Sequence, residues 1–141
     1  MNLRRLTALA IVGALLAACS SSSPAASEAA GNGTINATVH EWSIDLASNT
    51  ASAGEVTFNI SNTGDETHEF VIVSTDLDAA ELPVVDDQVD ESAFTPVDEV
   101  EDIESGTNPT LTVDLDPGHY VILCNLLAHY GKGMHANLTV E

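Results

Sequence analysis

Residues 118–134 read Gly-His-Tyr-Val-Ile-Leu-Cys-Asn-Leu-Leu-Ala-His-Tyr-Gly-Lys-Gly-Met, an apolar strand that runs into a loop. The loop carries Cys124, His129 and Met134 in the spacing C-x4-H-x4-M. A thiolate, an imidazole and a thioether are soft ligands, and two histidines with a cysteine and a weak axial methionine are typical of a blue-copper site. The loop lacks a second histidine, and we expect His68 to supply it from elsewhere in the chain.

The rest of the chain favours strands over helices. Alternating apolar residues predict strands at 34–40, 42–46, 55–62 and 110–115, and shorter runs predict strands at 97–103, 120–124 and 136–140. The unbroken apolar run in 68–74 predicts a central strand that is covered on both faces. Together they predict an all-β fold, an antiparallel Greek-key β-sandwich of seven to eight strands.

An acidic insertion interrupts this pattern. The segment from Asp76 to Glu104 holds 12 acidic residues and few strong structural signals. Residues 76–82 are expected to form one or two helical turns, with Thr75 or Asp76 as the cap and Pro83 after the end. We therefore expect a short helical or irregular insertion on the sandwich.

The N-terminal residues predict export and anchoring. Residues 1–18 combine Arg4 and Arg5, an apolar run and a small-residue site before Cys19, which resembles a prokaryotic lipobox. We expect a lipoprotein signal peptide at 1–18, lipidation of Cys19, a flexible tether at 19–33 and one domain at 34–141. The expected location is extracytoplasmic, lipid-anchored to the membrane at the cell surface or in the periplasm. An ordinary signal peptide with a chance cysteine is the alternative.

Charge and cysteine content narrow the function classes. Removal of residues 1–18 changes the formal charge from −19 to about −21 and leaves Lys132 as the one basic side chain. Such a surface repels nucleic acid and favours basic partners or plain solvation. If Cys19 carries lipid, Cys124 has no cysteine with which to form an intramolecular disulfide.

Three pieces of the sequence resemble the cupredoxins, the type 1 copper family of plastocyanin and azurin. They are Asn62-Thr63-Gly64 before His68-Glu69-Phe70, Pro117-Gly118-His119-Tyr120 before the penultimate strand, and Cys124, His129 and Met134 before the last strand. The resemblance covers roughly residues 35–141. It implies one copper ion with His68, Cys124 and His129 as close ligands and Met134 as the long axial ligand.

Two departures from the family matter. Four residues separate Cys124 from His129, where plastocyanin has two. The residue after the upstream histidine is often asparagine in the family and is Glu69 here, so Asn125 is expected to hydrogen-bond Glu69 and connect the two ligand segments.

Each ligand also has a plainer interpretation. His68 would then be a solvated residue at a strand start, His129 a surface loop residue and Met134 a core residue. His135 is expected to point away from an inward Met134, and His40 and His119 are interpreted as surface residues.

The sequence supports three classes of function. The first is a membrane-anchored carrier of single electrons between redox partner proteins, some of them basic. The second is an extracytoplasmic copper chaperone or store, and the third is a copper-free interaction module. An enzyme is not expected, because no second metal cluster, Ser/His/Asp set or phosphate-binding loop is recognisable in the sequence.

Overall fold

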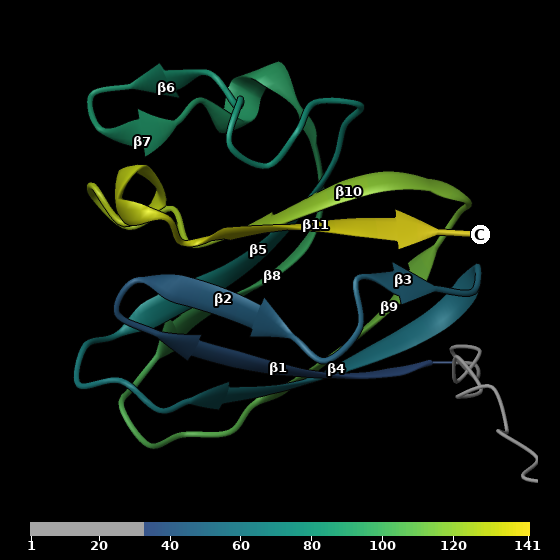
Figure 1. Ribbon diagram of the computed structural model, residues 1–141, viewed down its shortest axis with the longest axis horizontal. Coiled ribbons are helices and arrows are strands. Elements are labelled where there is room, and N and C mark those ends of the chain that lie inside the picture. The colour runs from purple at the N-terminus through teal and green to yellow at the C-terminus, as the bar shows by residue number, and fades with distance from the viewer. Residues whose placement is uncertain (1–32) are drawn as a thin grey trace, which may run out of the picture.

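The alternating apolar residues form two β-sheets that pack face to face in the computed structural model, which describes residues 33–141 (Figure 1). The elements are β1 (Thr34–His40), β2 (Ser43–Leu46), β3 (Thr50–Ala51), β4 (Gly54–Asn62), β5 (His68–Ser74), β6 (Val84–Val85), β7 (Gln88–Val89), η1 (Glu91–Ala93), β8 (Thr95–Ile103), β9 (Thr110–Leu115), β10 (Gly118–Leu123), η2 (Tyr130–Lys132) and β11 (His135–Val140). Here η marks a short 3₁₀ turn.

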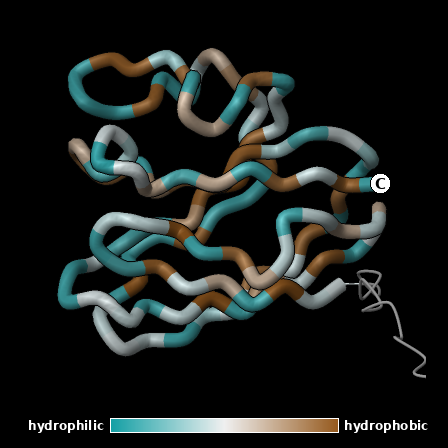
Figure 2. The backbone as a smooth tube through the Cα atoms, in the orientation of Figure 1, coloured by the Kyte–Doolittle hydropathy of each residue, from teal (hydrophilic) through white to brown (hydrophobic). Residues whose placement is uncertain are grey.

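The first sheet has the strand order β2-β1-β4-β9. Burial alternates along β4, with Val56, Phe58 and Ile60 buried, because successive side chains of a strand point to opposite faces. Figure 2 shows the same alternation of apolar and polar residues along the strands of this sheet. Its inner face therefore forms one half of the core.

The second sheet has the order β3-β11-β10-β5-β8, with β5 in its interior. Phe70 and Ile72 of β5 face the first sheet, and the Phe70 ring lies 5.3 Å from the Phe58 ring across the core. Val71 and Val73 face the opposite way and are also buried. The prediction of a strand covered on both faces is therefore confirmed.

The acidic insertion covers that outer face. Ala79, Leu82 and Val89 pack with Val71 and Val73, and the β6–β7 hairpin and η1 complete this layer. Because apolar surface of the sheet is removed from water there, the insertion is an integral part of the fold.

The predicted helical turns at 76–82 are wrong. The Thr75 hydroxyl accepts a hydrogen bond from the Leu77 N–H, but only bends and a turn follow. The backbone N–H of Ala79 donates to the Asn137 side chain at 2.8 Å and that of Leu82 to the Tyr130 hydroxyl at 3.0 Å. These tertiary hydrogen bonds replace the helical ones.

The predicted all-β sandwich is confirmed, with differences in detail. Nine strands form the two sheets, and two neighbouring pairs, β1 with β4 and β3 with β11, run parallel and not antiparallel. β8 corresponds to the strand predicted at 97–103, begins two residues earlier than expected, at Thr95, and lies at the edge of the second sheet. The two-residue β3 lets the chain cross between the sheets, and a strand this short leaves no periodic signal in the sequence.

The predicted signal peptide at 1–18, the lipidation of Cys19 and nearly all of the tether at 19–33 lie outside the described residues. Within residues 33–141, no helix has the length and apolar character needed to cross a bilayer.

Candidate metal centre

The loop that joins β10 to β11 closes upon itself through its backbone. The Cys124 N–H donates to the Met134 carbonyl at 3.1 Å, and the Met134 N–H donates to the His129 carbonyl at 3.3 Å. Cys124 continues the inward-facing series of Tyr120 and Ile122, so its sulfur points into the core between the sheets. The three predicted loop ligands are therefore held by one short set of hydrogen bonds.

His68 reaches this loop because of the strand pairing. β5 runs antiparallel to β10, with Val71 opposite Leu123, so the start of β5 lies beside the end of β10. His68, the first residue of β5, is completely buried. The topology thus brings together side chains that are 56 positions apart in the sequence, as the sequence analysis expected.

Three donor atoms converge at this end of the sandwich. The ligand atoms of His68, Cys124 and His129 lie within 4.8 Å of one another, and all three residues are buried. The His129 Nδ1 is 3.3 Å from the Cys124 Sγ and 3.4 Å from the His68 Nδ1. Among the described residues, no other group of three or more His, Cys, Asp or Glu side chains meets in this way.

Met134, the fourth predicted residue, is completely buried in the same core cluster as Cys124. It contacts the backbone of both Cys124 and His129 through the hydrogen bonds that close the loop. The methionine is therefore fixed next to the donor group.

The donor set fits a thiophilic cation. Burial raises the pKa of the Cys124 thiol, although the Glu69 N–H, 3.3 Å from the sulfur, acts in the opposite direction. Burial also lowers the pKa of His129, and the neighbouring His68 adds to this effect. A cation placed among these atoms would favour the thiolate and the neutral imidazoles, which are the forms that ligate metals.

Comparison with family models gives a match to the Cupredoxin-like domain over residues 8–140. The chain belongs to the cupredoxin-like family. Comparison with curated proteins gives no match.

Solved structures agree with this cupredoxin assignment. The dithionite-reduced auracyanin of the photosynthetic bacterium Roseiflexus castenholzii is 26% identical, with a TM-score of 0.60 over 77% of this chain and 96% of that chain. Auracyanin A of Chloroflexus aurantiacus, a "blue" copper protein, is 22% identical, with a TM-score of 0.58 over 77% and 98%. Rusticyanin of Thiobacillus ferrooxidans shares the fold at 19% identity, with a TM-score of 0.56 over 77% and 76%.

In this cupredoxin, both histidines turn their second ring nitrogen toward a glutamate. The His68 Nε2 lies 3.1 Å from the Glu41 Oε1, and the His129 Nε2 lies 3.6 Å from the Glu66 Oε2. Hydrogen bonds, led by one from the Glu66 backbone N–H, lower the pKa of Glu41 to about 2. Neither glutamate is predicted by the sequence pattern. Glu66 stands two residues before His68, but no local pattern marks Glu41.

Asn125 has a different partner from the one expected. Its side chain turns away from Glu69, accepts from the Val89 N–H at 2.7 Å and donates to the Val89 carbonyl at 3.1 Å and the Glu91 carboxylate at 2.6 Å. The Asn125 backbone N–H is the group that hydrogen-bonds the Glu69 carboxylate. The segments that carry His68 and Cys124 are therefore connected by two backbone N–H groups. The Asn125 N–H donates to the Glu69 carboxylate, and the Glu69 N–H donates to the Cys124 Sγ.

The acidic insertion is hydrogen-bonded to the ligand loop at several further points. The Tyr130 hydroxyl donates to the Ala79 carbonyl at 2.7 Å and accepts from the Leu82 N–H. The Ala128 N–H donates to the Asp87 carbonyl at 2.9 Å, which places the hairpin turn beside the loop (Figure 1). The insertion therefore fixes the loop from outside the sandwich.

The other histidines lie outside the donor group. His135 packs its ring on Tyr130, 5.0 Å between centroids, and does not join the group around Cys124. His40 bonds Asp45 at 3.1 Å, and His119 contacts the Thr75 carbonyl at 2.7 Å.

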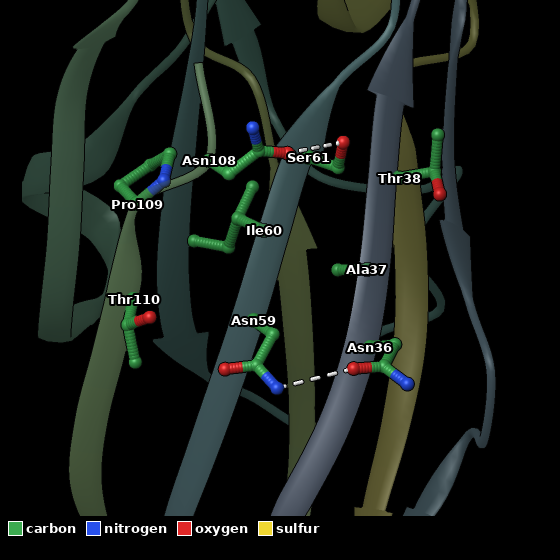
Figure 3. Close-up of a pocket in the computed structure, with 9 residues that line it drawn as sticks. All are labelled: Asn36, Ala37, Thr38, Asn59, Ile60, Ser61, Asn108, Pro109 and Thr110. Atoms are coloured by element: carbon green, nitrogen blue, oxygen red, sulfur yellow. Dashed lines mark hydrogen bonds between the residues drawn. The ribbon is translucent and has the colours of Figure 1, made fainter.

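A surface hollow over β1, β4 and the start of β9 is a weaker candidate (Figure 3). Its polar side chains bond each other, Asn59 to Asn36 at 3.1 Å and Ser61 to Asn108 at 2.7 Å. Its lining contains no titratable or nucleophilic side chain other than hydroxyls, so it offers little for chemistry.

Proposed function

We propose that this chain is a membrane-anchored extracytoplasmic type 1 copper protein that carries single electrons between redox partners. The observation that carries the proposal is the convergence of the His68, Cys124 and His129 donor atoms within 4.8 Å in a buried site. In the proposal these three are the close ligands of one copper ion, and Met134 is its weak axial ligand. The likeness to auracyanin A, a "blue" copper protein, supports this assignment.

The chemistry of the donors suits reversible one-electron transfer. When bound, copper supplies a couple between Cu(II), for which the thiolate is a strong donor, and Cu(I), which thioether sulfur favours. The chain keeps the donors in place through the hydrogen bonds between Cys124, His129 and Met134. Ligands that do not move with oxidation state reduce the reorganisation that accompanies electron transfer.

The proposed anchor is lipid on Cys19, followed by the tether at 19–33. The start of β1 lies at the end of the sandwich opposite the ligand loop (Figure 1). In the proposal, a tether of 15 residues, which reaches at most roughly 50 Å, joins the domain at the end remote from the metal centre.

The proposed partners are redox proteins with a basic surface. Leu127, two residues before His129, has 66% of its surface exposed and offers an apolar contact near the metal centre. The hairpin beside the loop carries the exposed Asp86 and Asp87. Small apolar contacts with charged surroundings suit weak, short-lived redox encounters.

The visible spectrum of the copper-loaded chain tests the proposal. We expect an intense thiolate-to-Cu(II) band and a reversible one-electron couple in the wild type. Cys124→Ala should lose the band, because the thiolate is its electron donor, while the fold remains. Copper binding without a thiolate band, or no copper binding, would contradict a type 1 site.

A further inference from the structure

The turn between β1 and β2 places two adjacent residues against the two histidines of the metal centre. Glu41 and Trp42 lie in the turn between two strands of the first sheet, whereas His68 begins a strand of the second sheet and the ligand loop joins two others. The Glu41 carboxylate lies 3.1 Å from the His68 Nε2. The Trp42 ring meets the His129 ring edge to face, with 4.9 Å between centroids and an angle of 79° between planes. Each histidine therefore has its own support from this turn.

Glu41 determines which nitrogen of His68 faces the centre. A carboxylate only accepts hydrogen bonds, so the ring hydrogen of a neutral His68 lies on Nε2. The Nδ1 lone pair is then directed toward His129, whose Nδ1 is 3.4 Å away. A fixed tautomer of this kind is what a metal-ligating imidazole requires.

The position of the Glu41 carboxylate is itself defined. Its Oε1 also accepts from the Glu66 backbone N–H at 2.7 Å, and only 24% of the side-chain surface is exposed. It packs directly on Gly64, where an added Cβ would collide with the carboxylate atoms. Glu41 therefore joins the β1–β2 turn to the segment that precedes His68.

Trp42 packs against the ligand loop. The Lys132 ammonium lies 3.3 Å from the centroid of its ring, a cation–π contact, and the His129 ring also contacts the indole. Gly133 has a φ of +117°, and a Cβ there would lie 3.2 Å from the Trp42 carbonyl oxygen. His129 and Lys132 of the ligand loop therefore contact the indole, and Gly133 lies against the Trp42 backbone.

We propose that Glu41 and Trp42 are positioning residues of the metal centre: Glu41 fixes the tautomer of His68 and increases its donor strength, and Trp42 fixes the ring of His129. The effect on copper rests on the proposed function, whereas the tautomer and ring order are properties of the metal-free chain. A carboxylate behind a ligating imidazole raises its basicity. The stronger donor favours the more highly charged Cu(II), so Glu41 lowers the reduction potential.

Two substitutions of Glu41 separate charge from hydrogen bonding. Glu41→Gln keeps an acceptor for His68 and removes the charge, whereas Glu41→Leu removes both. The control is Asp45→Asn, which removes one charge from the same hairpin, where Asp45 pairs with His40 at 3.1 Å and not with the centre. The probes are ¹⁵N NMR of the imidazoles without metal and the reduction potential with copper.

We expect Glu41→Gln to retain the Nε2–H tautomer of His68 and to shift the potential to a more positive value than Asp45→Asn does. Glu41→Leu should give a mixture of His68 tautomers and weaker copper binding. Gly64→Ala, which displaces the carboxylate without altering it, should reproduce the tautomer mixture. An unchanged tautomer in both Glu41→Leu and Gly64→Ala, or equal potential shifts in Glu41→Gln and Asp45→Asn, would overturn the role of Glu41.

For Trp42, the test is Trp42→Leu in the metal-free chain. We expect broadened or averaged His129 ring resonances with His68 unaffected, and a smaller effect of the same kind in Lys132→Gln. Sharp, wild-type His129 signals in Trp42→Leu would overturn the proposed role of Trp42 in fixing the His129 ring. A chain that binds no copper would contradict the proposed function and leave these metal-free measurements intact, so the two failures are distinguishable.

Discussion

Three of the four proposed copper ligands are each fixed by a group behind the side chain. The Cys124 Sγ accepts the Glu69 N–H at 3.3 Å, His68 has Glu41, and His129 has Trp42. Met134 differs, because the contacts that fix it run through its backbone and not through its thioether. The side chain of Met134 can therefore be changed while the geometry of the other donors is retained.

Met134→Leu should keep copper bound and raise the reduction potential. The substitution preserves volume at a completely buried position, so we expect a loss of less than about 1.5 kcal/mol in the free energy of unfolding. Loss of a weak axial donor destabilises Cu(II) relative to Cu(I), which moves the potential upward. Voltammetry with a metal assay checks this. Complete loss of copper would identify Met134 as a primary ligand and contradict the axial assignment.

At the scale of elements, the acidic insertion acts as an outer layer for the ligand loop. The Tyr130 hydroxyl is the central connection, since it bonds two backbone groups of the insertion, at Ala79 and Leu82. Tyr130 follows His129 directly, so a change at this contact should alter the position of a proposed copper ligand. The insertion should influence the metal centre without contributing a donor.

Tyr130→Phe tests this connection. Removal of the hydroxyl leaves a buried N–H and a buried carbonyl without that partner, so we expect a loss of about 1–3 kcal/mol in the free energy of unfolding and a changed thiolate band. The control is Tyr120→Phe, whose hydroxyl donates to the Asp116 carbonyl at 2.8 Å at the opposite end of β10. It should leave the spectrum unaltered. Equal spectra for both variants would mean that the insertion does not act on the site.

The sequence predicted those features that depend on residues close together in the chain. The C-x4-H-x4-M loop follows an apolar strand, and pairing of neighbouring strands then brings His68 to Cys124. Alternation in β4 predicted its buried face because the side-chain period of a strand is two.

Features that depend on contacts between distant segments escaped prediction. Glu41 and Trp42 meet the histidines across two sheets, and no spacing in the sequence encodes that approach. The helix expected at 76–82 failed for the same reason, because Asn137 and Tyr130 supply hydrogen-bond partners that local propensity does not include.

At the scale of the whole molecule, exposed acidic residues and an exposed leucine offer a redox partner two different kinds of surface. The formal charge of the chain is −19, and β8 carries the exposed Asp98, Glu99, Glu101 and Asp102 along the edge of the second sheet. Leu127, in contrast, offers exposed apolar surface in the ligand loop. We expect the acidic residues to attract a basic redox partner at long range, and Leu127 to contribute only once the two proteins are in contact.

Leu127→Asp should slow electron exchange with a basic redox protein at every salt concentration, because it disrupts the docked contact. Neutralising Asp98, Glu99, Glu101 and Asp102 should matter only at low salt, since exposed charges are screened beyond about 8 Å at physiological ionic strength. Stopped-flow rates against a basic c-type cytochrome, over a series of salt concentrations, provide the measurement.

The matched control for this prediction is Leu77→Asp, which adds the same charge at another exposed leucine, 42% accessible and outside the ligand loop. An added negative charge alone should attract a basic partner slightly, so Leu77→Asp should not slow the reaction. If Leu127→Asp exchanges electrons as fast as Leu77→Asp, docking does not use this apolar surface. A salt dependence that survives neutralisation of the β8 carboxylates would instead assign the attraction to other acidic groups, such as Asp86 and Asp87 beside the loop or Glu66 beside His129.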